Sequence, residues 1–440
     1  MPDDTGGATS EERRSLSERA HAVIPGGSHT YAKGDDQFPE GSPSVLVRGE
    51  GCRVWDEAGN EFIEYGMGLR SVSLGHAEPR VLDAVGRQLR LGVNYTRPSR
   101  IEIECAEMLA ELVGADMVKF CKDGSTATTA AVKLARAHTG REIVAFCQDH
   151  PFFSYDDWFI GATEMDAGVP AAIKELSAPF RYNDLASVEA LFSRFAGSVA
   201  CVILEAERSD PPVDGFLPGV QALCAENGAL FVLDEMLTGF RWHLGGAQAY
   251  YDLAPDLSTF GKAMANGFSV SALVGRREIM ERGGLHHDGE RVFLLSTTHG
   301  AETHALAAAL ETMKIYREEN VVKELWEIGA RLREGIQAAA DGLGIGRSFQ
   351  VVGRPPNLAY TTRDPSGRPS QLFRTLFLQE LIDRGFIAPS LVVSTAHDSE
   401  IDRTVGAVGA ALEVYAAALE HGPERYLRGR SVQPVYRRFN

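Results

Sequence analysis

The pattern of hydrophobic and polar positions changes along the chain. Between residues 44 and 66, apolar and polar positions alternate in SVLVRGEGCRVWDEAGNEFIEYG, with breaks at Gly51 and at the polar stretch 56–60. A period of two is typical of strands that bury one face, and the breaks supply the turns. The segment therefore predicts a short antiparallel meander, which is too small to fold alone.

From about residue 70 to residue 300, the apolar positions gather into short uninterrupted runs. These runs are MVKFC, EIVAFC, VACVILE, ALFVLDE, STFG and SALVG, and helix-compatible stretches such as TATTAAVKLARAHTG separate several of them. Apolar strands that alternate with helices predict an α/β fold, a mostly parallel central sheet with helices on both faces. In such sheets, ligands bind beyond the carboxyl ends of the strands.

Beyond residue 300 the apolar positions follow a helical period, as in ETHALAAALETMKIYREENVVKELWEIGARLREGI. Strand-like pieces near FQVVG, LAYTTR and GFIAPS predict a smaller α+β domain there. Near the amino terminus, SEERRSLSERAHAVIP predicts a first helix capped by Ser10 and stopped at Pro25. We expect three segments: a helix, loop and meander that pack with the small domain (1–69), the large domain (70–300) and the small domain (301–440).

Composition and charge narrow the classes of ligand. The 440 residues carry a formal net charge of -16, and the sequence pI is near 5.3. Nucleic-acid backbones and anionic membranes attract an excess of Lys and Arg, so neither is an expected partner. The acidic, polar start MPDDTGGATSEERR is unlike a secretory signal, and no apolar segment approaches membrane-spanning length. We expect a cytoplasmic protein that acts on a small polar molecule.

Cysteine and histidine usage gives little support to a disulfide framework or a metal site. The six cysteines contain no CxxC pair, and none of the twelve histidines falls in a convincing ligand motif. We expect reduced, mostly buried thiols and no bound metal.

Two acids follow the apolar run ALFVL, namely Asp234 and Glu235. At the carboxyl end of a strand they can hold a metal, act as acid and base, or bind a cationic group. Capping of a helix is an equally good interpretation for either acid.

A second feature follows the run MVKFC, where residues 123–126 read Asp-Gly-Ser-Thr and lead directly into a helical pattern. Gly124 allows close backbone approach, and free N–H groups at a helix start attract an anion, typically a phosphate. An ordinary helix cap explains the same residues. The stretch is neither a P-loop nor a GxGxxG fingerprint, so a nucleoside triphosphate or NAD is not indicated.

The third feature is Lys262 in LSTFGKAMANGF, a lysine with no acid in its own stretch. Taken alone, it reads as a lysine whose stem is buried and whose ammonium group lies in water. Taken with a nearby carboxylate and an anion-binding turn, it fits pyridoxal 5'-phosphate (PLP). That cofactor has a phosphate to hold, a ring nitrogen to protonate and an aldehyde that condenses with a lysine amine.

These stretches resemble the class III aminotransferases and are most similar to glutamate-1-semialdehyde aminomutase. The likeness runs from IPGG at Ile24, through WDEAGNEFIEYG and LGH at Leu74, to APS at Ala388. Its most specific part holds Asp234 and Lys262, which stand 28 positions apart. The resemblance implies that Asp234 is the acid at the pyridine nitrogen. It implies that Lys262 forms the aldimine with PLP.

The resemblance also implies a fold-type I architecture and a homodimer whose active sites use both subunits. Gly124 and Ser125 match the phosphate-binding turn of the family. Met236 matches the apolar residue packed under the cofactor ring. Thr297, in LLSTTHGAET, matches the threonine that reaches the phosphate of the neighbouring subunit.

Departures from the family pattern gather where substrate is expected. The usual aromatic-His-Gly segment is replaced by DHPFFSYDDW, in which Phe152 is the expected stacking ring and His150 the alternative. Lys33 stands at the position of the substrate-binding arginine, and a lysine offers a point charge in place of a planar fork. Thr126 replaces the acid that usually follows the phosphate turn.

We therefore expect an aminotransferase that moves an amino group from an amino-acid donor to a ketone or aldehyde of a small polar metabolite. Lys262 then serves as covalent anchor and general base. The first alternative is glutamate-1-semialdehyde 2,1-aminomutase, which uses the same cofactor chemistry. A second alternative, from another class, is a non-catalytic PLP-binding sensor or partner protein. Racemisation and decarboxylation also stay open.

Overall fold

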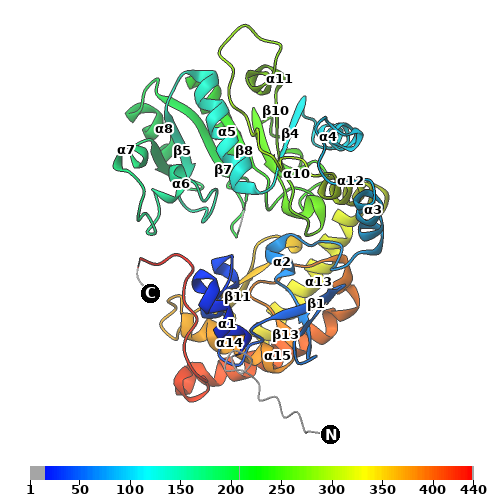
Figure 1. Cartoon of the computed structure of the whole chain (residues 1–440). Helices are drawn as coiled ribbons and strands as arrows, with labels where there is room; N and C mark the ends of the chain where they lie inside the picture. The colour runs from blue at the N-terminus through cyan, green and yellow to red at the C-terminus, as the bar shows by residue number, and fades with distance from the viewer. Residues whose placement is uncertain (1–14, 208, 439–440) are drawn as a thin grey trace.

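The structure is a computed structural model that describes residues 15–207 and 209–438. A large sheet with its helices forms one part of the molecule, drawn in the upper half of Figure 1. The amino-terminal segment and the carboxy-terminal helices form the other part, drawn in the lower half.

The large sheet has seven strands in the order β4-β10-β9-β8-β7-β5-β6. β10 runs antiparallel to both of its neighbours, and the other pairs are parallel, so the predicted mostly parallel sheet is confirmed. The strands are β4 (Met117–Cys121), β5 (Ile143–Cys147), β6 (Ser177–Phe180), β7 (Val199–Glu205), β8 (Leu230–Asp234), β9 (Leu257–Phe260) and β10 (Ser271–Gly275). Only β6 was absent from the predicted set, because SAPF lacks an apolar run.

Helices cover both faces of this sheet. Every residue of β7, β8 and β10 is buried, and successive strand residues point to opposite faces, so neither face meets solvent there. α5 packs against β7 to β10, α9 packs against β7 and β8, and α4 packs against β4. The helices of this part are α3 (Pro79–Leu89), α4 (Arg100–Val113), α5 (Gly124–Thr139), α6 (Asp157–Ile160), α7 (Ala171–Lys174), α8 (Leu185–Arg194), α9 (Phe216–Asn227), α10 (Gly246–Tyr250) and α11 (Arg277–Met280).

The predicted meander is present as β1 (Leu46–Glu50), β2 (Arg53–Asp56) and β3 (Glu61–Glu64), joined by antiparallel pairing. Its sheet is completed by a distant strand, β13 (Phe386–Ile387), which pairs parallel to β3. The amino-terminal segment therefore shares a sheet with the carboxy-terminal part. On this basis we propose the division into segments 1–69, 70–300 and 301–440.

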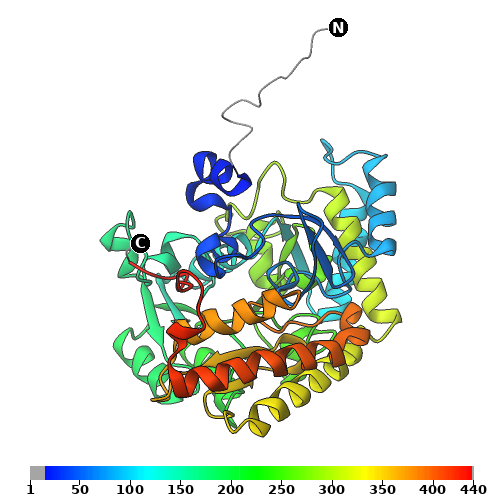
Figure 2. The ribbon, with the colours of Figure 1, turned by 90° about the horizontal axis from the view of Figure 1, so that it is seen from below.

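Long helices dominate the carboxy-terminal part. The predicted helical stretch after residue 300 forms two helices, because Asn320 adopts a left-handed φ of 52° between them. Figure 2 shows α13 and α15 side by side, with α14 next to α15. The elements are α12 (Thr303–Glu318), α13 (Val321–Gly342), α14 (Gln371–Asp383), α15 (Ile401–His421) and the hairpin of β11 (Phe349–Val352) and β12 (Ala359–Thr362).

The first described helix is α1 (Leu16–Val23), which begins with a capping box between Ser15 and Glu18. The cap expected at Ser10 lies outside the described residues. The carboxy-terminal tail returns to this region, where Arg437 pairs with Asp36 at 2.7 Å. The remaining short helices are η1 (Pro25–Gly27), η2 (Tyr31–Lys33), η3 (Asp35–Gln37), α2 (Met67–Arg70), η4 (Lys262–Ala265), η5 (Glu281–Gly283), η6 (Pro355–Asn357), η7 (Thr395–Glu400) and η8 (Pro423–Arg425).

The six cysteines are buried and free, as expected for reduced thiols. Among the described residues, none of the helices has the length and apolar character needed to cross a membrane.

Candidate active site

The carboxyl ends of β7 and β8 place two carboxylates next to each other. Glu205 ends β7, Asp234 ends β8, and the strand register pairs them directly. Asp234 is buried, and its Oδ1 accepts hydrogen bonds from the Met236 backbone N–H at 2.9 Å and the Thr259 hydroxyl at 3.0 Å. The register also pairs Asp234 with Thr259 on β9. Neighbouring strands thus fix one buried carboxylate at the sheet edge where ligands bind.

The carboxylate of Glu235, unlike that of Asp234, binds the start of a helix. Its carboxylate accepts hydrogen bonds from the backbone N–H groups of Ala247 at 2.9 Å and Gln248 at 2.7 Å, and from the Thr238 hydroxyl. These amides belong to the first turn of α10, so Glu235 satisfies the start of that helix. Burial raises the pKa of Glu235 to about 7, against the effect of these hydrogen bonds. Helix capping therefore accounts for Glu235.

Lys262 follows β9 at the start of η4, and its backbone has a left-handed φ of 45°. Its side chain is partly buried. Burial lowers the pKa of Lys262 to about 8, while the carboxylates of Asp234 and Glu205 act in the opposite direction. The guanidinium groups of Arg241 and Arg70 lower that pKa further. The amine is uncharged at mildly alkaline pH far more often than a surface lysine, as a nucleophile or proton carrier requires.

Met236 joins the lysine loop to the anion-binding turn. A Cβ added at Gly124 would lie 2.9 Å from Met236 Sδ, and one added at Gly261 would lie 2.7 Å from the same atom. Real Cβ atoms do not approach this closely, so both positions require glycine for the present packing. The first residue of α5 and the residue before Lys262 therefore both lie against the Met236 side chain.

The anion-binding turn is the first turn of α5. Asp123 caps this helix, since its carboxylate accepts from the Thr126 backbone N–H at 2.9 Å. The Ser125 hydroxyl accepts from the Tyr155 backbone N–H at 3.2 Å, which ties the turn to the stretch after His150. The two interpretations of this stretch, an ordinary helix cap and an anion-binding turn, thus both have a physical basis. The Asp123 carboxylate caps the helix, and the helix start remains at the sheet edge.

The two candidates for the ring-stacking residue differ in burial. His150 is 3% exposed, and its Nδ1 accepts from the Glu205 backbone N–H at 3.0 Å. Phe152 is 46% exposed and contacts Phe159 edge-on, with ring centroids 6.0 Å apart. His150 is therefore tied to the edge that carries Glu205 and Asp234, and Phe152 lies toward solvent.

Thr297 is exposed, in a segment linked to the anion-binding turn. Glu302, at the end of this segment, pairs with Lys122, which directly precedes Asp123. Its other oxygen lies 3.1 Å from His299 Nδ1. The structure thus places the Thr297 segment near the turn of its own subunit, with the threonine side chain directed to solvent.

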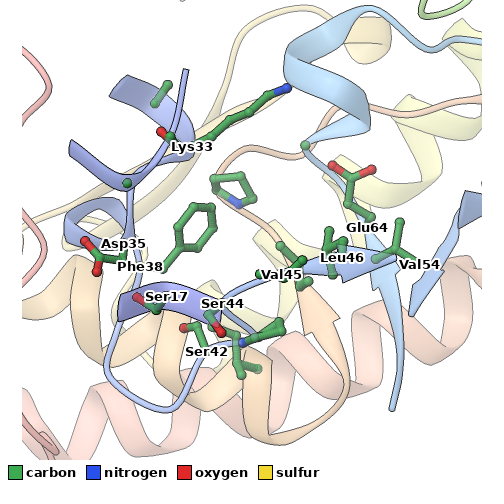
Figure 3. A pocket seen from close by; sticks show the side chains of 18 of the residues that line it. Ser17, Lys33, Asp35, Phe38, Ser42, Ser44, Val45, Leu46, Val54 and Glu64 are labelled. Carbon is green, nitrogen blue, oxygen red and sulfur yellow. The ribbon is translucent and has the colours of Figure 1, made fainter. Parts of the chain in front are cut away.

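Lys33 lies on η2. It lines a cavity of about 820 Å³ between the amino-terminal segment and the meander. Figure 3 shows the Lys33 side chain extending toward α2, whose Gly68 and Leu69 line the same cavity. Polar side chains on the cavity wall include Asp35, Glu64 and His76.

Sequence reasoning missed two arginines beside Lys262. Arg241 has no solvent exposure and donates from Nη1 to the Leu237 carbonyl at 3.1 Å and from Nη2 to the Arg70 carbonyl. Arg241 stands only seven positions after Asp234, inside a stretch already singled out. Arg70 lies far from Lys262 in the sequence, and no local pattern points to it.

The residues present fit PLP. The helix start at Gly124 offers backbone N–H groups to a phosphate, Asp234 offers a carboxylate to a ring nitrogen, and Lys262 offers an amine to an aldehyde. Two glycines keep space around Met236, where a Cβ would intrude. In the part of the chain that the structure describes, no cluster of three or more His, Cys, Asp or Glu side chains is arranged to hold a metal ion.

Comparison with known proteins gives a family. Residues 37–346 match the family Aminotransferase class-III. A glutamate-1-semialdehyde 2,1-aminomutase of Desulforamulus reducens is 32% identical over 421 residues, which cover 90% of this chain and 96% of that protein.

Solved structures agree with this family. The FumI protein of Sphingopyxis sp. MTA144, in its PLP internal aldimine form, is 28% identical with a TM-score of 0.83, covering 94% of this chain and 97% of its own. An omega-transaminase of Sphaerobacter thermophilus is 25% identical with a TM-score of 0.83, covering 94% and 98%. The expected family and fold are thus confirmed, and the chain belongs to the class III aminotransferases, fold-type I enzymes that depend on PLP.

Proposed function

We propose that this enzyme moves an amino group from an amino-acid donor to the ketone or aldehyde carbon of a small polar metabolite, with Lys262 as its central residue. The observation that carries the proposal is the amine of Lys262 close to the buried Asp234. Its pKa of about 8 leaves part of the amine uncharged near neutral pH.

PLP, when bound, supplies a ring that withdraws electrons from the substrate carbon that loses its proton. The chain's own residues hold the cofactor and move that proton. The Lys262 amine would hold the cofactor and, once the amine of the donor has displaced it, would take the proton from the substrate Cα as general base. Asp234 would offer its carboxylate to the protonated ring nitrogen and keep that proton in place.

For the rest of the cofactor site we propose Gly124 and Ser125 at the phosphate, because they begin a long helix at the sheet edge. Met236 packs against the ring. We place His150, rather than Phe152, on the other side of the ring, because His150 is buried beside Glu205.

The proposed enzyme is a homodimer in which Thr297 reaches the cofactor phosphate of the partner subunit. Its side chain is exposed within its own chain. The backbone of this segment is joined to residues 92–94, since Asn94 donates to the Thr298 carbonyl at 2.9 Å. Exposed apolar side chains cluster in the same stretch of chain: Leu82, Leu89, Leu91, Tyr95 and Ile103. Exposed apolar side chains on the stretch that is joined to the Thr297 segment support burial against a second copy.

We infer a cytoplasmic location from the six buried, free thiols, which suit a reducing compartment. The cavity beside Lys33 supports a polar acceptor, because Asp35, Glu64 and His76 offer hydrogen-bonding groups along its wall. We propose that Lys33 contacts the part of the acceptor that lies in this cavity.

The test is a screen of donors and acceptors with the PLP-loaded enzyme, read as conversion of the bound cofactor to pyridoxamine phosphate. The proposal expects conversion by at least one amino acid and reconversion by a carbonyl compound. A cofactor that never converts across a broad donor panel would instead indicate a binding protein. Efficient formation of 5-aminolevulinate from glutamate-1-semialdehyde alone, with the pyridoxamine form, would indicate the aminomutase.

A further inference from the structure

The segment that precedes the LGH stretch at Leu74 contains a left-handed turn. In α2 the φ angles of Met67, Gly68, Leu69 and Arg70 are 44°, 57°, 57° and 71°. Residues with a Cβ avoid this region because of steric contact with the following carbonyl, so three such residues within four successive positions are strained. Strain of this kind persists only where surrounding contacts hold the backbone, and it gathers at functional sites.

Contacts from the large domain hold this turn. The Arg241 guanidinium donates to the carbonyl of Arg70. The side chain of Asn266, four positions after Lys262, accepts from the backbone N–H groups of Ser73 and Leu74, each at 3.0 Å. The loop that carries Lys262 therefore fixes the segment that follows the turn, and Arg241 fixes the turn itself.

Two guanidinium groups act on the Lys262 amine, and they differ in access. Arg241 has no solvent exposure, and its Nη atoms donate to the carbonyls of Leu237 and Arg70. Arg70 is partly exposed. Of these two, Arg70 is the cation that a bound substrate can contact, while Arg241 supports the backbone beneath it.

A contact with the small domain orients the Arg70 side chain. Arg70 Nε donates to Asn357 Oδ1 at 3.0 Å, and Asn357 is buried in η6. A guanidinium group is planar, so one Nε bond sets the directions of its other N–H groups. Such a preset fork suits a carboxylate, which it binds through two parallel hydrogen bonds.

We propose that Arg70 binds the carboxylate of the amino donor, which makes amino acids, and not simple amines, the donor class of this enzyme. The inference rests on the proposed amino transfer and names the group that selects its donor. Lys33 offers a single flexible ammonium group on η2, which leaves recognition of the donor carboxylate to Arg70. The turn that carries Arg70 is bound to Arg241, and the segment after it is bound to Asn266 of the Lys262 loop. A donor held at Arg70 by its carboxylate would therefore present its amine to Lys262.

The experiment compares the affinities of the PLP-loaded enzyme for probes of matched shape. 2-Methylalanine and tert-butylamine differ by a carboxylate in place of a methyl group, and neither has a Cα proton to lose. Their binding is followed by the absorbance change of the bound cofactor. Propionate and propionamide serve as competitors in the same assay. The variants are Arg70→Gln, Arg70→Lys and, because asparagine tolerates positive φ, Arg70→Asn. The control is Arg194→Gln, which removes an exposed arginine at the end of α8.

We expect the wild type to prefer the carboxylate member of each pair by at least tenfold. Arg70→Gln and Arg70→Asn should remove that preference with the affinity for tert-butylamine changed less than about twofold, and Arg70→Lys should keep part of it. Arg194→Gln should change neither the preference nor the affinity for tert-butylamine. A wild type without preference for either carboxylate overturns the inference, as does a preference that survives in both Arg70→Gln and Arg70→Asn. Because neither amine has a Cα proton, neither can follow the proposed proton-transfer route, and its binding is measured whether or not that route operates.

Discussion

The Thr259 hydroxyl donates a hydrogen bond to Asp234 Oδ1 at 3.0 Å, across the register that pairs β9 with β8. Both residues are buried, and the strand that holds Thr259 leads within three positions to Lys262. The acid and the amine of the proposed site are therefore positioned by adjacent strands of one sheet.

Thr259→Val tests this relationship. Valine keeps the shape and the strand preference, but it removes the hydroxyl that stabilises the Asp234 carboxylate, so kcat should fall by about tenfold. Thr259→Ser should restore most of the rate. Thr312→Val is a matched control in a buried part of α12, where the Thr312 hydroxyl has no hydrogen-bond partner among the described residues. A rate that is equal in Thr259→Val and Thr312→Val would contradict a positioning role.

The lowered pKa of Lys262 gives a pH prediction. The reaction of the cofactor-free enzyme with PLP should speed up as pH rises and level off above about 8, because burial favours the uncharged amine. Asp234 acts in the opposite direction, so Asp234→Asn should move the midpoint to lower pH. Stopped-flow absorbance measures both profiles. A midpoint near the usual lysine value of about 10.4 would rule out the lowered pKa.

The same shift has a consequence for stability. The unfolded chain keeps the Lys262 proton up to about pH 10.4, while the cofactor-free folded chain loses it near pH 8. The unfolded state thus binds more protons in this window, and the free energy of unfolding should rise with pH through it. Lys262→Met should flatten this part of the profile in urea unfolding. A slope that is unchanged in this variant would assign the effect to other groups.

Gly124→Ala and Gly261→Ala test the packing around Met236. Each new Cβ would lie under 3 Å from Met236 Sδ, so the methionine must shift into the space assigned to the cofactor. We expect at least tenfold weaker PLP binding in both variants, measured by fluorescence titration. Gly406→Ala, at an exposed helical position with open space, should bind PLP normally and stabilise the fold by about 1 kcal/mol. Unchanged PLP affinity in both test variants would remove Met236 from the cofactor site.

Thr297→Ala tests the shared active site. Loss of a hydroxyl at the phosphate should weaken PLP binding several-fold. Mixed dimers of Thr297→Ala with Lys262→Ala should regain one intact site, since each site takes its lysine and its threonine from different chains. Light scattering should report a dimer at micromolar concentration. A monomer that is fully active, or mixed dimers without recovery, would contradict the proposal.

The sequence was sufficient to predict the sheet, because strands buried on both faces leave uninterrupted apolar runs such as VACVILE and ALFVLDE. It was also sufficient to select Asp234 and Lys262 as candidates, since both follow such runs. The apolar run alone did not show which of the two acids that follow it, Asp234 or Glu235, belongs to the cofactor site; only the family resemblance pointed to Asp234. That distinction depends on where α10 begins, which is a property of the folded chain.

Arg70 shows a different limit. Nothing local in GMGLRS requires a left-handed turn over three residues with a Cβ. The turn depends on Arg241 and Asn266, which are more than 170 positions away in the sequence. Tertiary contacts of this kind override local conformational preference, and a pattern read along the chain does not contain them.

The proposed enzyme depends on attachment of the cofactor to the Lys262 amine. Borohydride reduction of the PLP-loaded enzyme, followed by proteolysis and mass spectrometry, detects this attachment. We expect one pyridoxyl group on the peptide that contains Lys262, and its loss in Lys262→Ala together with the yellow colour. A label on a different lysine, or no label after loading with excess PLP, would show that Lys262 does not attach the cofactor.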